Sequence, residues 1–249
     1  MISVKRNLIS ALYALVATMA MISAAMSMSL SPIHIEMAST GLGSRAQITV
    51  TNDSQWPLPV EITVHNMTMD EAGGRSLGRS DNEFLVFPPQ ALVPAGQSQV
   101  FRLQWVGEPQ LSRSESFLIT ANQIPVRLPV DKNVVQVVMS FGVVVNVAPP
   151  KGLPELKLVG TGIETDRKTG KRHPTVTVHN SANVHGLLPQ SILRVSGGNW
   201  SHTFMSNEMS EKIGIGLVQP GKRRKFVLPV ELPARVTNVQ ATLDFRPRR

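Results

Sequence analysis

Residues 134–147 of the chain read VVQVVMSFGVVVNV, and the two-residue alternation along them predicts one long β-strand. Successive side chains of a strand point to opposite faces, so the stretch separates into two rows. One row is apolar throughout, whereas the other is mixed. The unbroken row consists of Val135, Val137, Met139, Phe141, Val143, Val145 and Val147. At about 3.3 Å per residue the stretch would span about 46 Å, which is longer than one small β-sandwich needs.

An exposed apolar edge strand is an aggregation hazard, and proteins normally protect such strands with Lys, Glu or Pro. This predicted strand contains none of these residues. Two interpretations fit. The strand could be central and buried on both faces, or it could be an edge strand that lends its apolar row to another protein by β-strand addition. The second interpretation also allows the free protein to self-associate through this strand.

Further strand patterns lie on both sides of this stretch, separated by turn sequences. Residues 148–154, APPKGLP, interrupt the pattern, because three prolines and a glycine cannot continue a sheet ladder, and they predict a stiff linker. The other predicted strands cover residues 30–37, 46–52, 60–67, 99–106, 116–124, 175–179, 191–195, 200–205, 225–232 and 239–245.

The two halves of the chain resemble each other. Residues 48–54, ITVTNDS, resemble residues 176–181, VTVHNS, and about 40 residues later each half has a Pro/Gly turn that leads into a strand. These turns are LVPAG at 92–96 and LVQPG at 217–221. We therefore predict an all-β protein with two related sandwich domains, residues 26–148 and 154–249, joined by a linker at 149–153.

Residues 1–25 have the three parts of a secretory signal peptide. Lys5 and Arg6 supply the positive charge, residues 8–22 form an apolar run, and small residues follow at 23–25. The alternative is a membrane anchor, since the run approaches the lower length limit for spanning a bilayer. No charged stop-transfer flank follows it, so we expect cleavage near Met26 and an exported protein without stable membrane insertion.

The composition excludes several kinds of chemistry. The chain has 249 residues, 42% of them hydrophobic, a formal net charge of +8 and no Cys, which rules out disulfides, a Cys-ligated zinc and a thiol nucleophile. No nucleophile elbow, Walker A loop or His-Glu-x-x-His motif occurs. The Gly-rich residues 41–46, GLGSRA, lead into a strand, so they offer no helix N-terminus to a phosphate. We predict no enzyme activity and no cofactor.

Metal and nucleic-acid sites are also not predicted. The spacing of Asp166, His179 and His185 matches no metal-ligand arrangement, and solvated turn residues explain them better. Basic clusters at 168–172, 222–225 and 246–249 have neither interleaved aromatic residues nor a recognition helix, which argues against nucleic acid as a partner. Their charge leaves an acidic partner open.

Residues 115–125, ESFLITANQIP, resemble the signature strand of the periplasmic pilus-assembly chaperones of the chaperone–usher system, in which Glu-Ser precedes an apolar run that ends in Ile-Pro. The exported, Cys-free pair of sandwiches, the linker and the long strand before it resemble the same family in order. The resemblance implies two immunoglobulin-like domains arranged as a boomerang in the periplasm. It implies two partners: pilus subunits, whose incomplete fold residues 134–147 would complete, and an outer-membrane usher.

The resemblance also implies binding residues. Typical members clamp the terminal carboxylate of the subunit with an Arg on the first strand and a Lys on the donor strand. Here these positions hold His34 and Val144, so His34 is a candidate cleft residue, and the chain fits a divergent, archaic or alternative branch. We expect residues 126–133 to form a short loop, which suits chaperones of simple multi-subunit fibres. The predicted subunit-binding residues are Val135, Val137, Met139 and Phe141, with Val143 and Val145 continuing the row toward the cleft.

Glu115 matches an acid that joins the two domains in this family, and its usual Arg partner aligns with Ala148. We therefore predict an interdomain pair between Glu115 and Lys151. A different class of function stays open at this point, namely a secreted immunoglobulin-like adhesion or ligand-binding module, in which the strand at 134–147 would be buried.

Overall fold

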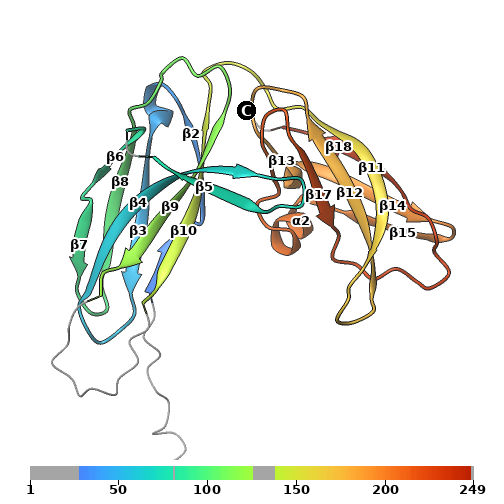
Figure 1. Cartoon of the computed structure of the whole chain (residues 1–249), viewed down its shortest axis with the longest axis horizontal. Coiled ribbons are helices and arrows are strands. Elements are labelled where there is room, and N and C mark those ends of the chain that lie inside the picture. Colours follow the sequence, from blue (N-terminus) through green and yellow to red (C-terminus); the bar gives the residue numbers. More distant parts are fainter. Residues whose placement is uncertain (1–27, 81, 126–137, 248–249) are drawn as a thin grey trace, which may run out of the picture.

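The computed structural model describes residues 28–80, 82–125 and 138–247, which form two lobes of β-sheet set at an angle to each other (Figure 1). In the first lobe, one sheet has the strand order β1-β3-β8-β6, and the other has the order β2-β10-β9-β4-β5, with β7 also paired to β4. The strands are β1 (Met28–Ser31), β2 (His34–Ala38), β3 (Arg45–Asn52), β4 (Leu58–Met69), β5 (Arg75–Arg79), β6 (Phe84–Phe87), β7 (Gln90–Val93), β8 (Ser98–Trp105), β9 (Glu115–Gln123) and β10 (Ser140–Ala148).

Alternating residues of the two sheets meet in the core of this lobe. Phe117 of β9 is fully buried and makes edge-to-face contacts with Phe84 and Trp105 of the opposite sheet, with ring centroids 5.0 and 5.7 Å away. Such pairs stabilise a core beyond the area that they bury. The two-residue alternation read from the sequence is therefore the alternation between core and surface.

The first strand of the lobe is divided between the two sheets. β1 pairs antiparallel with β3, and after Pro32 the chain enters the other sheet, where β2 pairs parallel with β10. The sequence predicted one strand over residues 30–37, but Pro32 has no N–H to continue a ladder and marks the change of sheet. The pairing of β2 with β10 extends only from Val144 to Ala148.

The second lobe is built from short sheets and one short helix. Its sheets have the orders β11-β12-β17, β15-β14-β18 and β13-β16. β17 covers only the start of the predicted strand at 225–232, because Pro229 and Pro233 cannot donate to a ladder. None of the helices in the described ranges is long and apolar enough to cross a membrane. The elements are β11 (Leu156–Thr165), β12 (Arg172–Asn180), β13 (Gly186–Leu187), β14 (Ser191–Gly197), β15 (Trp200–Phe204), α2 (Ser206–Lys212), β16 (Leu217–Val218), β17 (Arg223–Val227) and β18 (Gln240–Phe245).

The repeat found in the sequence is also a repeat of hydrogen bonds. Asn52, at the end of β3, is fully buried; its Nδ2 donates to Val93 O at 3.0 Å, and its backbone oxygen accepts a bond from Gly96 N at 2.8 Å. A fully buried Asn ends β12 in the same way and ties that strand to the equivalent Pro/Gly turn. The bonds in the second lobe are Asn180 Nδ2 to Val218 O (3.0 Å) and Gly221 N to Asn180 O (2.9 Å).

A hairpin of the first lobe reaches the second lobe. In Figure 1 the hairpin of β4 and β5 crosses the space between the lobes and ends beside the second one. The side-chain amide of Gln219 accepts a bond from Met69 N and donates one to Met67 O, both at 2.8 Å, and Lys225 N donates to Glu71 O at 2.7 Å. We call residues 67–75 the arm. Three hydrogen bonds that involve backbone groups therefore fix the arm to the second lobe.

The turn of the arm requires glycine. Gly73 has φ +97°, and a Cβ there would lie 2.6 Å from a terminal nitrogen of Arg224, which lies against the turn. Arg224 also donates from Nη1 to Leu217 O at 3.3 Å and contacts the sulfur of Met69 at 3.2 Å. A side chain at position 73 would displace Arg224 from this contact.

Candidate functional site

β10 has two ends in different environments. From Val144 onward it lies between β9 and β2, whereas Ser140–Gly142 pair with β9 alone within the described ranges. Phe141 in this half-paired part is 38% exposed, and Val138 just before it is 48% exposed. Among the described residues, the outer edge of β10 therefore presents backbone groups without a strand partner next to apolar side chains.

The predicted subunit-binding row begins outside the described residues, because Val135 and Val137 lie in the range 126–137. Met139 is half-buried and packs against a cluster in the core of the first lobe. Phe141 follows on the same face and is exposed at the edge of the sheet. Of the four side chains predicted to fill subunit pockets, the structure thus places two, at the half-paired end of β10.

Val143 and Val145 do not lie where the sequence placed them. Both are fully buried in the core of the first lobe, where they stand opposite Ile119 and Phe117 of β9. The apolar row continues as predicted, but beyond Phe141 it faces the interior of its own sandwich. The side chains of these two valines have no accessible surface in this structure, so neither is exposed for contact with a partner.

The opposite face of β10 contributes to the junction of the two lobes. Val144 packs with Met67 of the arm and Leu217 of the second lobe in one buried cluster. His34, the predicted cleft residue, is the register partner of Val144 in the parallel ladder of β2 and β10. The two positions singled out by the family resemblance are therefore neighbours at this junction.

A buried polar residue lies next to Val144. Asn146 is fully buried, accepts a hydrogen bond from Ser116 Oγ at 2.8 Å and donates one to Glu36 Oε1 at 2.8 Å. Its Nδ2 also lies 3.1 Å from His34 Nε2. Asn146 is thus bonded to the strands on both sides of β10.

Glu36 connects this polar cluster to the second lobe. Its carboxylate lies 2.6 Å from His34 Nε2 and 2.5 Å from Nε2 of His185, which is 4% exposed and also contacts Ser114 Oγ through Nδ1 at 2.9 Å. Burial raises the pKa of Glu36, but hydrogen bonds from His185, His34 and Asn146 and the charge of His185 outweigh it. The pKa falls from its ordinary value of 4.5 to about 2.

The predicted pair of Glu115 and Lys151 is not formed. No ion pair joins these two side chains in the part of the chain that the structure describes, and Lys151 is exposed. Burial, and then repulsion by Glu83, raise the pKa of Glu115. The contact that joins a carboxylate of the first lobe to the second lobe is instead that of Glu36 with His185. The interpretation of His185 as a solvated turn residue is wrong, because it is buried at this junction.

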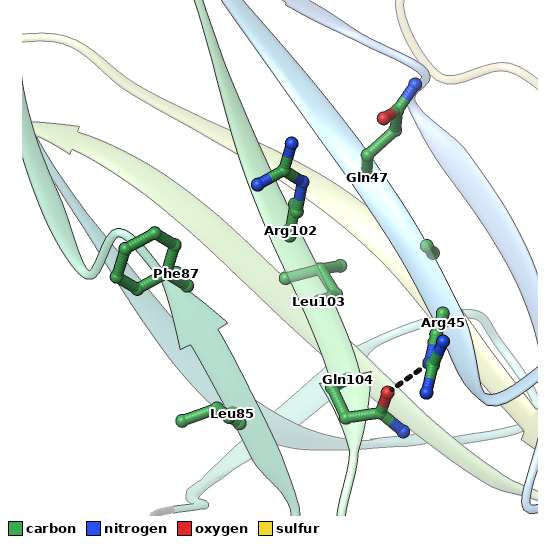
Figure 2. Close-up of a pocket in the computed structure, with 8 residues that line it drawn as sticks. Arg45, Gln47, Leu85, Phe87, Arg102, Leu103 and Gln104 are labelled. Atoms are coloured by element: carbon green, nitrogen blue, oxygen red, sulfur yellow. Dashed lines mark hydrogen bonds between the residues drawn. The ribbon is translucent and has the colours of Figure 1, made fainter.

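Figure 2 shows an open hollow on the outer face of β3, β8 and β6, away from the junction of the lobes. Leu85 and Phe87 are largely exposed there, and Arg45 Nε donates to Gln104 Oε1 at 2.8 Å. None of its lining residues is a carboxylate, a histidine or a hydroxyl, so the hollow contains no acid–base pair. The lining residues are Arg45, Ala46, Gln47, Leu85, Phe87, Arg102, Leu103 and Gln104.

Comparison with protein families gives the class of protein. Residues 29–152 match the model of the pili and flagellar-assembly chaperones, PapD N-terminal domain. The chain belongs to this family, which is a family of chaperones rather than enzymes. No curated protein sequence matches the chain.

Solved structures support the same fold over both lobes. The chain is similar to a chain in the solved structure of the Salmonella enterica SafA pilin in complex with the SafB chaperone. The identity is 19%, the TM-score is 0.51, and the match covers 83% of this chain and 86% of the matched chain. It is similar to the Escherichia coli chaperone DraB (17% identity, TM-score 0.50, coverage 87% and 98%). It is also similar to the CsuC–CsuE chaperone–tip subunit pre-assembly complex from the archaic Csu pili of Acinetobacter baumannii (13%, 0.50, 88% and 99%). The predicted fold of two immunoglobulin-like β-sandwich domains is confirmed.

Proposed function

We propose that this chain is a periplasmic chaperone that binds pilus subunits through the strand containing β10 and delivers them to an outer-membrane usher. The observation that supports this proposal is the half-paired end of β10, where Ser140–Gly142 have β9 on one side and no strand on the other within the described residues. An unpaired edge beside exposed apolar side chains is the geometry that β-strand addition uses.

The physical basis is the complementary defect of the partner. A subunit that lacks its last strand exposes an apolar groove and unpaired backbone N–H and C=O groups, and one added strand covers both. We propose that Val135, Val137, Met139 and Phe141 occupy the groove. At about 1.5 to 3 kcal/mol for each fully buried side chain, four anchors contribute several kcal/mol before the cost of ordering.

Capture of a terminal carboxylate by an Arg–Lys pair is not part of this proposal. His34 occupies the first-strand position and is already bound to Glu36, while its strand neighbour at the other position is Val144. A second carboxylate would meet the negative charge of Glu36. This departure supports placing the chain in the archaic or alternative branch of the family.

The test is recovery of a pilus subunit co-expressed with the chain in the periplasm. Val137→Asp combined with Met139→Asp should leave the chaperone folded but abolish recovery of the subunit, because two carboxylates cannot enter an apolar groove. Leu77→Asp is the matched control, since Leu77 is an exposed apolar residue on the distant edge strand β5. Normal recovery by the double variant would overturn the proposal.

Export is a separate part of the proposal. Residues 1–25 lie outside the described residues, and the proposed signal peptide is tested by sequencing the N-terminus of the mature protein, which should begin near Met26. We propose no catalytic activity. The alternative, a secreted adhesion or ligand-binding module, is not favoured, because both the family and the similar structures are those of assembly chaperones. In the absence of subunit, the free edge also permits pairing with a second copy, which size-exclusion chromatography would detect.

A further inference from the structure

The buried half of β10 has a sequence that specifies its register weakly. Residues 143–147 read VVVNV, so a shift by two residues would put Val143 and Val145 into the sites of Val145 and Val147. Register is normally fixed by the alternation of apolar and polar side chains, and here nearly every side chain is valine. The apolar pattern alone therefore does not distinguish the observed register from one shifted by two residues.

Asn146 does distinguish these registers. It stands opposite Ser116 of β9 and Glu36 of β2 in the two ladders, and it is hydrogen-bonded to both. A shift by one residue would place its amide in the core site of Val145 or Val147. A shift by two would place it in the apolar site of Val144 or in that of Ala148. Either shift takes the amide away from these partners, which disfavours the shifted register.

We propose that Asn146 is a positioning residue that sets the register of β10 and, through it, the side chains that the free edge presents to a subunit. A single buried polar residue fixes register in the same way in apolar helix pairs. A shift by two residues moves β10 by about 7 Å, so that Met139 or Val143 would replace Phe141 at the edge. This last consequence rests on the proposed function, whereas the register itself does not.

The chain has no Cys, so engineered cysteine pairs can report the register. Ser140 stands opposite Asn122 in the observed register, and shifts by two residues would bring it opposite Thr120 or Ile124. With Asn146 present, S140C/N122C should form a disulfide roughly tenfold or more faster than S140C/T120C or S140C/I124C. In the N146V background, at least one of the shifted pairs should approach the rate of the native pair. Unchanged rates in N146V would overturn the proposal.

Two further variants keep the test decisive. If N146V folds poorly because the hydroxyl of Ser116 is left unpaired, S116A/N146V removes both partners and should show the same change in cross-linking. N52V is the matched control, since Asn52 is equally buried and hydrogen-bonded in the same lobe but does not touch β10. N52V should lower the stability of the lobe without raising the rate at which the shifted cysteine pairs form disulfides. If the shifted pairs also formed disulfides faster in N52V, the whole lobe would have loosened, and the proposal would be overturned.

Cross-linking is measured without any subunit, so it separates the two proposals. If the register shifts in N146V while recovery of a co-expressed pilus subunit is unchanged, the register proposal stands and the assignment of β10 as donor strand fails. If the register does not shift, the register proposal fails whatever the recovery.

Discussion

The two ends of β10 are built from similar residues but have different surroundings. Val143, Val145 and Val147 at one end are fully buried, whereas Phe141 and the preceding Val138 are exposed at the other. β9 pairs with both ends, so β9 does not explain the difference. The two ends differ in their second neighbour, since β2 pairs with β10 only from Val144 onward. The extent of this second neighbour thus decides which part of the β10 edge is covered, whereas Val143 is already buried by the core of the sandwich without pairing to β2.

The largest expected effect comes from placing the same charge at each end. Val145→Asp should destabilise the first lobe by about 3 to 5 kcal/mol, since it leaves an unpaired carboxylate in the core. Phe141→Asp should change stability by less than about 1 kcal/mol, because its side chain reaches solvent. Urea unfolding followed by tryptophan fluorescence, to which Trp105 in the core of the first lobe contributes, measures both. Equal losses would show that the two ends do not differ as described.

A smaller effect is expected at the contact of the buried end with the second lobe. Leu217→Ala removes a buried partner of Val144 and should cost about 2 kcal/mol, the lower end of the range for such truncations. Leu85→Ala is the control, because Leu85 is 60% exposed and its truncation should be nearly neutral. Calorimetry should show the two lobes melting further apart in Leu217→Ala. A single unshifted transition would mean that this cluster does not couple the lobes.

The polar side of the same junction should make stability depend on pH. The folded-state pKa of Glu36, about 2, is below its ordinary value of 4.5, so its ionised form stabilises the fold above pH 4.5, and this contribution is lost as the pH falls toward 2. The melting temperature of the wild type should therefore fall more steeply than that of Glu36→Gln between pH 4.5 and 2. Parallel curves would contradict the role of Glu36 in joining β2, β10 and His185.

The smallest effect is expected at Lys151, just beyond the buried end. Because Lys151 is exposed and not paired with Glu115, Lys151→Ala should change the free energy of unfolding by less than about 0.5 kcal/mol. A loss above 1 kcal/mol in urea unfolding would restore the interdomain pair that the sequence suggested.

Local features of the sequence predicted the fold well. The strand endings at Asn52 and Asn180 and their Pro/Gly turns could be identified, because each depends on a few neighbouring residues and a turn at a fixed offset. The apolar row of β10 could be identified for the same reason. Where the second edge of β10 becomes covered could not, since this depends on where β2 begins, at His34.

The junction of the lobes could not be predicted from the sequence. Glu36 and His185 are 149 positions apart, and Met67 and Gln219 are 152 apart, so neither contact leaves a periodic or spaced signal. One signal was available, the single Asn in an otherwise apolar half-strand. A polar residue at such a position needs partners on the neighbouring strands, and Asn146 has them on both sides.

The division of the first strand between two sheets also limits how much of the β10 edge is open. β2 occupies the outer edge of β10 from Val144 onward, and Val144 N already donates to Ile33 O at 3.1 Å. Any strand that adds to β10 from its free end must therefore stop where the backbone at Ile33 begins. The position of Pro32, and not the length of the apolar row, limits how far a partner can advance along β10.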